Sequence, residues 1–261
     1  APRVHRTRMR AAIAAGMVAF LAVAGVAGWA LLRDDAKAAP KKRAAAPTTT
    51  TTTTAPVPVG AVTATQKVPE VTAYQDAVET SVPVTKLTDK TEYNLPRTYL
   101  VTDQSSRPGW LNVLLPIRPN GASGWIKASD VTLGKSDYEI RIELAAHKLT
   151  LLKLGQPVLE SGIVIGADKT PTPPGKFYVT DPLDLHSQPN AGYGVFALGI
   201  SGYSDVLTSF KGGPGQLAVH GTNNPGQVGQ NISNGCVRVP NEIIEQIAAQ
   251  APLGTPVTIV A

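Results

Sequence analysis

The chain has 261 residues, a formal net charge of +5 and one cysteine. This length allows one or two globular domains, and a single cysteine excludes a framework of internal disulfides. Residues 1–66 carry a net charge of +7 and the remainder −2, so the basic character belongs to the N-terminal segment. With only 5% aromatic residues and no basic cluster after residue 66, the sequence argues against nucleic-acid binding.

The N-terminal segment begins with a basic tail over residues 1–10, followed by the 22 uncharged residues Ala11–Leu32. About 20 apolar residues suffice for a helix to cross a bilayer. We therefore expect a single-pass transmembrane helix over 11–32, with the tail in the cytoplasm and the rest of the chain outside. The alternative is a cleaved signal peptide, although its apolar core usually has about 7–15 residues.

Residues 33–67 are rich in Ala, Pro, Thr and Lys and include seven consecutive threonines at 48–54. Such a composition buries too little apolar surface to offset the entropy lost on ordering. We expect a disordered linker over 33–67, stiffened by its prolines, that separates the following domains from the membrane.

Residues 68–135 have the pattern of a small β domain. Short apolar runs alternate with turn residues, and Asn120-Gly121 between two such runs is typical of a hairpin. The expected strands of this region are TYLVTD (98–103), WLNVLLPI (110–117), WIKA (125–128) and DVTL (130–133).

Residues 136–261 continue as strands until Asn241–Gln250, where the apolar residues recur with helical spacing. Pro252 and Gly254 end that helix, and a last strand follows. The sequence therefore predicts a mostly β protein. The expected strands here are YEIRIELA (138–145), KLTLLKLG (148–155), PVLESGIVIG (157–166), KFYVTD (176–181), LAV (217–219), VRV (237–239) and TPVTIVA (255–261).

His220 and Cys236 are candidates for chemistry. His220 directly follows one short apolar strand and Cys236 directly precedes another, with a Gly/Asn-rich loop between them. A neighbouring imidazole can lower the pKa of a thiol and make it a better nucleophile. Backbone N–H groups of the intervening turn could stabilise an oxyanion. The alternatives are a buried structural cysteine and a structural histidine. No Cys/His cluster has metal-ligand spacing, so we expect neither metal nor cofactor.

The segment HGTNNPG…SNGCVR resembles the signature of the L,D-transpeptidase catalytic domain, the YkuD-type fold. The resemblance covers roughly residues 138–261 and includes TPTPPGKF at 170–177 and LGTPVTIV at 253–260. It implies a β-sandwich-like domain over 136–261 that acts on peptidoglycan. In that family a cysteine attacks the bond between the third and fourth residues of a donor stem peptide, and the acyl group passes to an acceptor amine.

Carried over by position, the resemblance makes Cys236 the nucleophile and His220 its base. Gly221 would orient the imidazole through its backbone carbonyl. The N–H groups of Asn234, Gly235 and Cys236 would form the oxyanion hole. Many members have histidine where this chain has Asn234, and we expect the substitution to be tolerated because the base is the earlier histidine.

Four residues are candidates for substrate binding. Arg238 could hold a substrate carboxylate, although a structural salt bridge is the equal alternative. Ser233 belongs to the turn before the cysteine, and Tyr193 and Tyr203 could line the cleft or simply pack. The partners implied by the resemblance are peptidoglycan stem peptides and carbapenems, which would acylate the thiol.

Residues 68–135 resemble a bacterial SH3-like domain, chiefly in GWLNVLLPIRPNGASGWI. Two other functions stay open for the whole chain. Water could replace the acceptor amine, which would make the protein an L,D-carboxypeptidase. Asn234 could instead mark a disabled site in a non-catalytic protein that binds the cell wall. His147 is expected at the surface, and His186 in a loop that could overhang the site.

Overall fold

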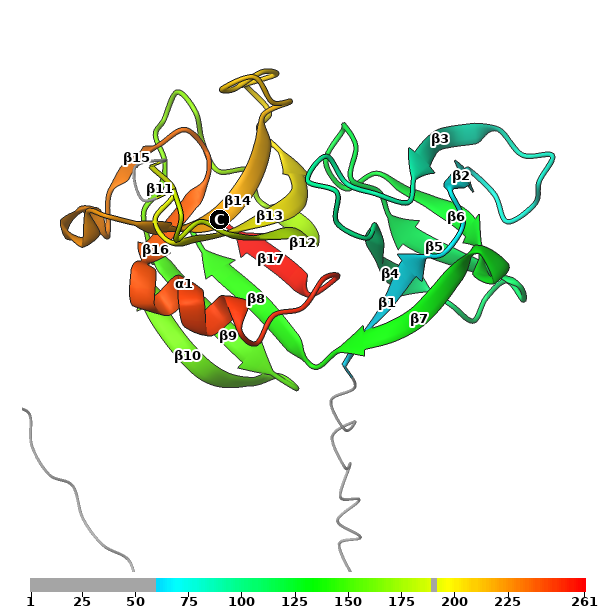
Figure 1. Cartoon of the computed structure of the whole chain (residues 1–261), viewed down its shortest axis with the longest axis horizontal. Helices are drawn as coiled ribbons and strands as arrows, with labels where there is room; N and C mark the ends of the chain where they lie inside the picture. Colours follow the sequence, from blue (N-terminus) through cyan, green and yellow to red (C-terminus); the bar gives the residue numbers. More distant parts are fainter. Residues whose placement is uncertain (1–59, 189–191) are drawn as a thin grey trace, which may run out of the picture. The chain divides into compact units, whose positions relative to one another are not determined.

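The computed structural model describes residues 60–188 and 192–261 (Figure 1). No helix within these ranges is long and apolar enough to cross a membrane. The basic tail, the expected transmembrane helix at 11–32 and the linker as far as residue 59 lie outside the described residues. The fold is mostly β, as the sequence predicts.

The first part of the described chain forms a seven-stranded sheet in the order β3-β2-β6-β5-β4-β1-β7. Its pairs are antiparallel, and one apolar cluster that includes the fully buried Tyr99, Val113 and Ile126 lies inside it. The strands are β1 (Ala61–Gln66), β2 (Glu70–Tyr74), β3 (Pro83–Thr88), β4 (Thr98–Asp103), β5 (Trp110–Leu114), β6 (Ser123–Lys127) and β7 (Val131–Ser136), with a 3-10 turn, η1, at Ala128–Asp130.

The expected linker over 33–67 extends too far. Residues 61–66 form β1, which pairs with both β4 and β7 and is therefore integral to the sheet. Gln66 is buried there because its side chain accepts a hydrogen bond from the Tyr99 hydroxyl at 2.7 Å and donates to two backbone carbonyls. Burial of a glutamine with its partners is a long-range arrangement that composition does not reveal.

The hairpin expected at Asn120-Gly121 is confirmed. Strands β5 and β6 pair as neighbours with Leu111 opposite Ile126, and Gly121 has a φ of 82° in the connecting turn. Glycine adopts that left-handed conformation without steric cost. The resemblance of this sheet to an SH3-like domain stays a prediction.

The second part of the chain forms an eight-stranded sheet in the order β10-β9-β8-β17-β12-β13-β14-β16. A small parallel pair, β11 with β15, lies beside it. The strands are β8 (Tyr138–Glu143), β9 (Lys148–Lys153), β10 (Gln156–Gly162), β11 (Ile165–Gly166), β12 (Gly175–Asp184), β13 (Phe196–Tyr203), β14 (Gln216–Thr222), β15 (Asn231–Ser233), β16 (Val237–Pro240) and β17 (Pro256–Val260), with a 3-10 turn, η2, at Pro225–Gln227.

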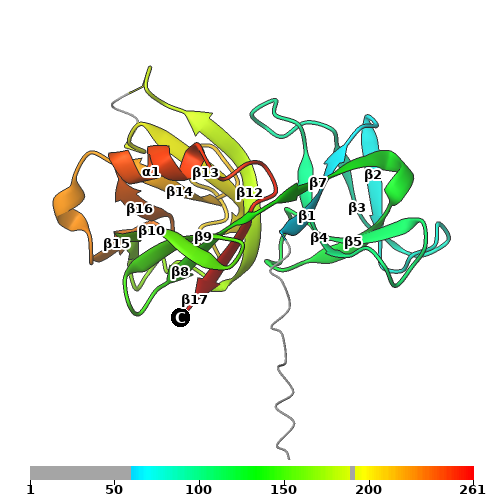
Figure 2. The same ribbon diagram turned by 90° about the horizontal axis from the view of Figure 1, so that it is seen from below.

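One apolar core serves both halves of this sheet. It contains residues of β8 and β9 as well as residues of β13, β14 and β16. Helix α1 (Asn241–Ala248) contributes Ile244 and Ile247, both fully buried, and packs against β13, β14 and β16 (Figure 2). The helix expected at 241–250 is therefore confirmed and ends two residues earlier.

Strand β13 was not expected from the sequence, which reads there as a Gly-rich stretch. Its glycines are required by close packing: a Cβ on Gly202 would lie 2.5 Å from the Phe177 ring, and one on Gly199 would lie 3.0 Å from Asp181. Glycine lowers strand propensity, but here it allows neighbouring strands and their side chains to approach. β13 thereby occupies an interior position in the sheet, next to β14, the strand that carries His220.

Candidate active site

The pairing of β14 with β16 brings the predicted base and nucleophile to one face of the sheet. The strands are parallel, with Val219 opposite Val237 and His220 opposite Arg238. Side chains alternate between faces along a strand. The two valines therefore point into the core, whereas His220 and Cys236 lie diagonally across the opposite face.

The turn before Cys236 is held by hydroxyl groups. Ser233 Oγ donates to the Cys236 carbonyl at 2.6 Å and accepts from the Gly235 N–H at 3.1 Å. Thr172 Oγ1 donates to the Gly235 carbonyl at 2.8 Å, and Thr170 Oγ1 donates to the Ser233 carbonyl at 3.0 Å. The TPTPPG segment therefore fixes the backbone on which the cysteine sits.

Gly235 has a φ of 107°, a conformation that side chains other than glycine rarely adopt. Its N–H is taken by Ser233, so it is not free to form the predicted oxyanion hole. Within the part of the chain that the structure describes, the N–H groups of Asn234 and Cys236 donate to no acceptor. Two of the three predicted donors thus remain available beside the sulfur.

His220 is 2% exposed, and its Nδ1 lies 2.7 Å from the Gly221 carbonyl. Because a carbonyl only accepts, Nδ1 carries the proton in this contact. This is the contact expected for Gly221 from its position after the histidine. Burial lowers the pKa of His220 to about 4, against the opposing effect of the Gly221 carbonyl, so the imidazole is neutral at pH 7.

Burial also raises the pKa of the Cys236 thiol. The Ala218 N–H, Arg238 and Lys211 act in the opposite direction but do not outweigh it. The sequence-based expectation that the imidazole lowers the thiol pKa is therefore wrong for the resting site. The physical reason is that both groups lose water on this face, and desolvation disfavours the charged form of each.

Two cations face the pair. Arg238 lowers the pKa of both His220 and Cys236, and so does Lys211. Within the described ranges Arg238 forms no ion pair, its Nε is buried without a partner, and its Nη1 lies 3.4 Å from Gln227 Oε1. The structural salt bridge considered for Arg238 is therefore absent there, which leaves its guanidinium group available to an anion.

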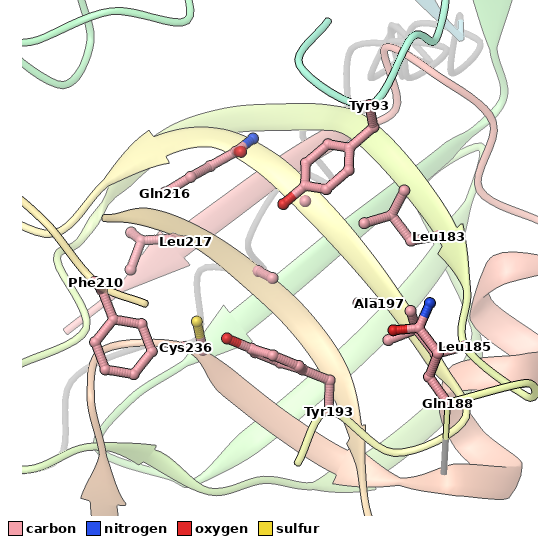
Figure 3. Close-up of a pocket in the computed structure, with 12 residues that line it drawn as sticks. Tyr93, Leu183, Leu185, Gln188, Tyr193, Ala197, Phe210, Gln216, Leu217 and Cys236 are labelled. Carbon is pink, nitrogen blue, oxygen red and sulfur yellow. The ribbon is translucent and has the colours of Figure 1, made fainter. Parts of the chain in front are cut away.

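A cavity of about 260 Å³ opens on the same face beside Cys236 (Figure 3). Tyr193 lines it, and its hydroxyl points toward the sulfur. The Tyr193 ring also lies edge-on to His220 with 4.9 Å between centroids. Tyr193 thus contacts His220, and its hydroxyl is directed toward Cys236. The full lining is Tyr93, Leu183, Leu185, Gln188, Tyr193, Ala197, Gly199, Phe210, Gln216, Leu217, Ala218 and Cys236.

Other predicted residues lie elsewhere. Tyr203 does not line this cavity, because its hydroxyl donates to the Pro116 carbonyl at 3.0 Å. Ser233 is buried within its turn, and the Asn234 side chain is exposed.

His186 lies on the surface, where its ring nitrogens are hydrogen-bonded to Asp184 and Glu245 at 2.7 and 2.8 Å. No group of three or more His, Cys, Asp or Glu residues in the described chain could hold a metal ion.

Several residues that line the cavity are not predicted from the sequence. Tyr93 comes from the turn between β3 and β4, and Phe210 from the loop between β13 and β14. Gln216 begins β14 on the same face as His220. Strand alternation backwards from His220 would have identified Gln216, but nothing local to Tyr93 or Phe210 indicates proximity to Cys236.

Residues 137–259 match the family model of YkuD, the L,D-transpeptidase catalytic domain. That match coincides with the eight-stranded sheet, and it contains the histidine and cysteine that share one face and the turn that the TPTPPG segment holds. Residues 137–259 are therefore similar to an L,D-transpeptidase catalytic domain.

Known proteins of this class resemble the same region. YkuD of Bacillus subtilis (strain 168), itself assigned as an L,D-transpeptidase, is 30% identical over 122 residues, which cover 47% of this chain and 65% of that protein. The corresponding protein of Bacillus licheniformis is 31% identical over 124 residues, with the same two shares. A mutant L,D-transpeptidase from Enterococcus faecium is a solved structure with 22% identity, 48% and 50% coverage and a TM-score of 0.38.

Proposed function

We propose that the protein is a cysteine L,D-transpeptidase that cross-links or remodels peptidoglycan. The observation that carries this proposal is the placement of His220 and Cys236 on one sheet face, at the edge of a cavity. A purely structural cysteine would not require an imidazole on the same sheet face, oriented by a backbone carbonyl.

The proposed reaction has two steps. As Cys236 Sγ attacks the donor amide carbonyl, the thiol proton passes to His220 Nε2. The N–H groups of Asn234 and Cys236 bind the oxyanion, and the C–N bond breaks as the leaving amine takes the proton from His220. An acceptor amine then attacks the thioester, the new amide forms, and the thiol regains its proton.

The neutral resting pair determines the timing of proton transfer. Because burial raises the pKa of Cys236 and lowers that of His220, a separated thiolate and imidazolium are disfavoured before substrate binds. The proton therefore moves with the attack rather than before it. Arg238 and Lys211 favour the anionic sulfur and oxyanion as charge develops.

Membrane anchoring is a separate part of the proposal. Residues 11–32 would hold the protein in the cell membrane with residues 1–10 in the cytoplasm, and the Pro/Thr-rich segment would place the catalytic domain at the cell wall. Protease added outside intact cells should cut the segment before residue 60. Cleavage only after the membrane is opened would contradict this orientation.

The function is tested first by intact-protein mass after exposure to a carbapenem. Opening the β-lactam ring releases no leaving group, so acylation adds the whole carbapenem mass. Wild type should gain it, Cys236→Ala should not, and His220→Ala should gain it on the order of 10²–10⁴ times more slowly. A wild type that is never acylated, with its fold intact by circular dichroism, would favour the non-catalytic wall-binding function.

A second assay separates transfer from hydrolysis. Wild type is incubated with a tetrapeptide donor, with and without an acceptor amine, and the products are separated by mass. A cross-linked product supports transpeptidation. Release of free tripeptide alone, even at high amine concentration, would make the protein an L,D-carboxypeptidase.

A further inference from the structure

Tyr93 reaches the catalytic cavity from a different sheet. It lies in the turn between β3 and β4, yet it lines the cavity together with Cys236 and Tyr193. In Figure 3 its ring projects into the cavity from the side opposite Cys236. Tyr93 is 53% exposed, so about half of its surface remains accessible to a ligand.

The turn that presents Tyr93 is held in one conformation. Thr91 N–H donates to the Leu95 carbonyl at 2.9 Å, and Thr91 Oγ1 lies 3.3 Å from the Tyr93 N–H. Asn94 has a φ of 60°, which asparagine tolerates better than most residues.

The Arg97 guanidinium connects the two ends of this loop, because it donates hydrogen bonds to the carbonyls of Thr88 and Lys90. An exposed aromatic ring on a fixed turn loses little entropy when a ligand binds.

The first sheet also contacts the loop over 204–215, which forms another part of the cavity wall. The Asn120 side chain accepts from the Tyr203 N–H at 2.8 Å and donates to the Tyr203 carbonyl at 2.7 Å. Arg118 donates to the carbonyls of Leu207 and Pro214 at 3.2 and 2.9 Å, and its guanidinium stacks on the Tyr203 ring. These contacts fix both ends of the loop over 204–215, which carries the cavity residue Phe210.

Gln216 adds a fixed hydrogen-bond acceptor to the cavity. Its Nε2 donates toward Thr180 Oγ1 and Asp181 Oδ2, both at 3.0 Å, and toward the Ile200 carbonyl at 3.1 Å. Because the carboxylate and the carbonyl can only accept, this network assigns which end of the amide is nitrogen. Gln216 Oε1 accepts no hydrogen bond within the described residues, so it is free to accept an N–H from a ligand.

The chemistry of the lining indicates the kind of group that binds. Its aromatic and aliphatic side chains are accompanied by two amides, and none of the twelve lining residues is charged. An uncharged segment with apolar surface and an N–H donor fits this lining, which describes a peptide backbone with small side chains. A cationic group would lose its hydration without gaining an ionic partner among these twelve residues.

We propose that Tyr93 is a substrate-binding residue, and that the first sheet completes the active site by contacting an uncharged peptide segment of the donor. This inference rests on the proposed function for the identity of the donor. It assigns to the first sheet a direct role in substrate binding, in addition to any role as a spacer or wall-binding domain.

The test measures donor binding separately from turnover. The affinity of a tetrapeptide donor is measured by calorimetry in the Cys236→Ala background, with and without Tyr93→Ala. We expect Tyr93→Ala to weaken binding about tenfold, which is roughly 1.4 kcal/mol, and Tyr93→Phe to retain most of the affinity. Val82→Ala replaces a 60% exposed residue in the loop between β2 and β3 that does not line the cavity, and it should have no effect.

In the enzyme with its cysteine, Tyr93→Ala should raise KM about tenfold with little change in kcat. Alkylation of Cys236 by iodoacetamide should be unchanged, because this small reagent needs no contact with Tyr93. Equal donor affinity in Tyr93→Ala and Val82→Ala, or no donor binding to Cys236→Ala, would overturn the inference. A parallel loss of thermal stability and alkylation rate would also overturn it by showing a structural role. Donor binding with the predicted dependence on Tyr93 but no turnover would leave the inference standing and refute the proposed function.

Discussion

The reactivity of the site depends on the desolvation of two residues, the buried His220 and the partly buried Cys236. Desolvation favours the neutral form of both side chains. It lowers the pKa of the imidazole and raises the pKa of the thiol. Simple alkylation of the thiol and base-assisted acylation should therefore respond differently to pH. Alkylation needs the thiolate, whereas acylation needs only a neutral His220.

We predict that the second-order rate of carbapenem acylation has its acidic limb near pH 4, because His220 remains an effective base until it is protonated with a pKa of about 4. This rate constant reports the ionisation of the free enzyme. Iodoacetamide alkylation should be slower at pH 7 than that of a free cysteine and should rise above the ordinary thiol pKa of ~8.5.

Stopped mixing at each pH, followed by intact mass, measures both profiles. His220→Ala should slow acylation strongly and change the alkylation profile little. Fast alkylation of the wild type at pH 6, lost in His220→Ala, would show instead that a thiolate–imidazolium pair exists at rest.

Among the elements, the TPTPPG segment before β12 has the closest connection to catalysis without supplying a reacting group. Thr172 Oγ1 accepts from the Gly166 N–H at 2.9 Å and donates to the Gly235 carbonyl at 2.8 Å. The hydroxyl of Thr172 thus links β11 to the turn before Cys236. Thr172 is only 4% exposed.

We predict that Thr172→Val lowers the free energy of unfolding by about 1–3 kcal/mol, because two buried backbone groups lose their partner. The acylation rate should fall with it, since the N–H groups beside the sulfur are no longer held. Urea unfolding and carbapenem acylation measure the two effects.

Thr150→Val is the matched control. Thr150 is also buried, but its hydroxyl lies 3.4 Å from the Glu160 carboxylate and far in sequence from the cysteine turn. Equal destabilisation and equal acylation rates in the two variants would contradict the role assigned to Thr172.

At the scale of the whole molecule, the boundary of the folded part decides which fragments are stable. Composition places this boundary near residue 68, whereas β1 begins at Ala61 and pairs on both sides. Removing β1 would expose one edge of β4 and one edge of β7 in the same sheet.

We predict that residues 60–261 form a soluble, cooperatively unfolding protein, and that residues 68–261 are strongly destabilised or aggregate. Soluble yield and urea unfolding of the two fragments measure this difference. The buried Gln66 and its bond to Tyr99 would be lost only in the shorter fragment. Indistinguishable unfolding of the two fragments would show that β1 is dispensable.

The sequence by itself determined the mostly β class, the hairpin at Asn120-Gly121, the helix that starts at Asn241 and the pair His220 and Cys236. These features depend on local periodicity, on turn residues, or on a motif whose residues are close in the chain. The resemblance to the L,D-transpeptidase domain rested on the same short motif, and the comparisons bear it out.

Only the tertiary structure decided the place of β1 and β13, the lining of the cavity and the direction of the two pKa shifts. Tyr93 and Cys236 are far apart in sequence, and no local pattern records that they line one cavity. Glycines that weaken β13 as an isolated strand are required by side chains of β12. The thiol pKa follows from the water removed by surrounding segments, and burial is a property of the assembled fold rather than of a motif.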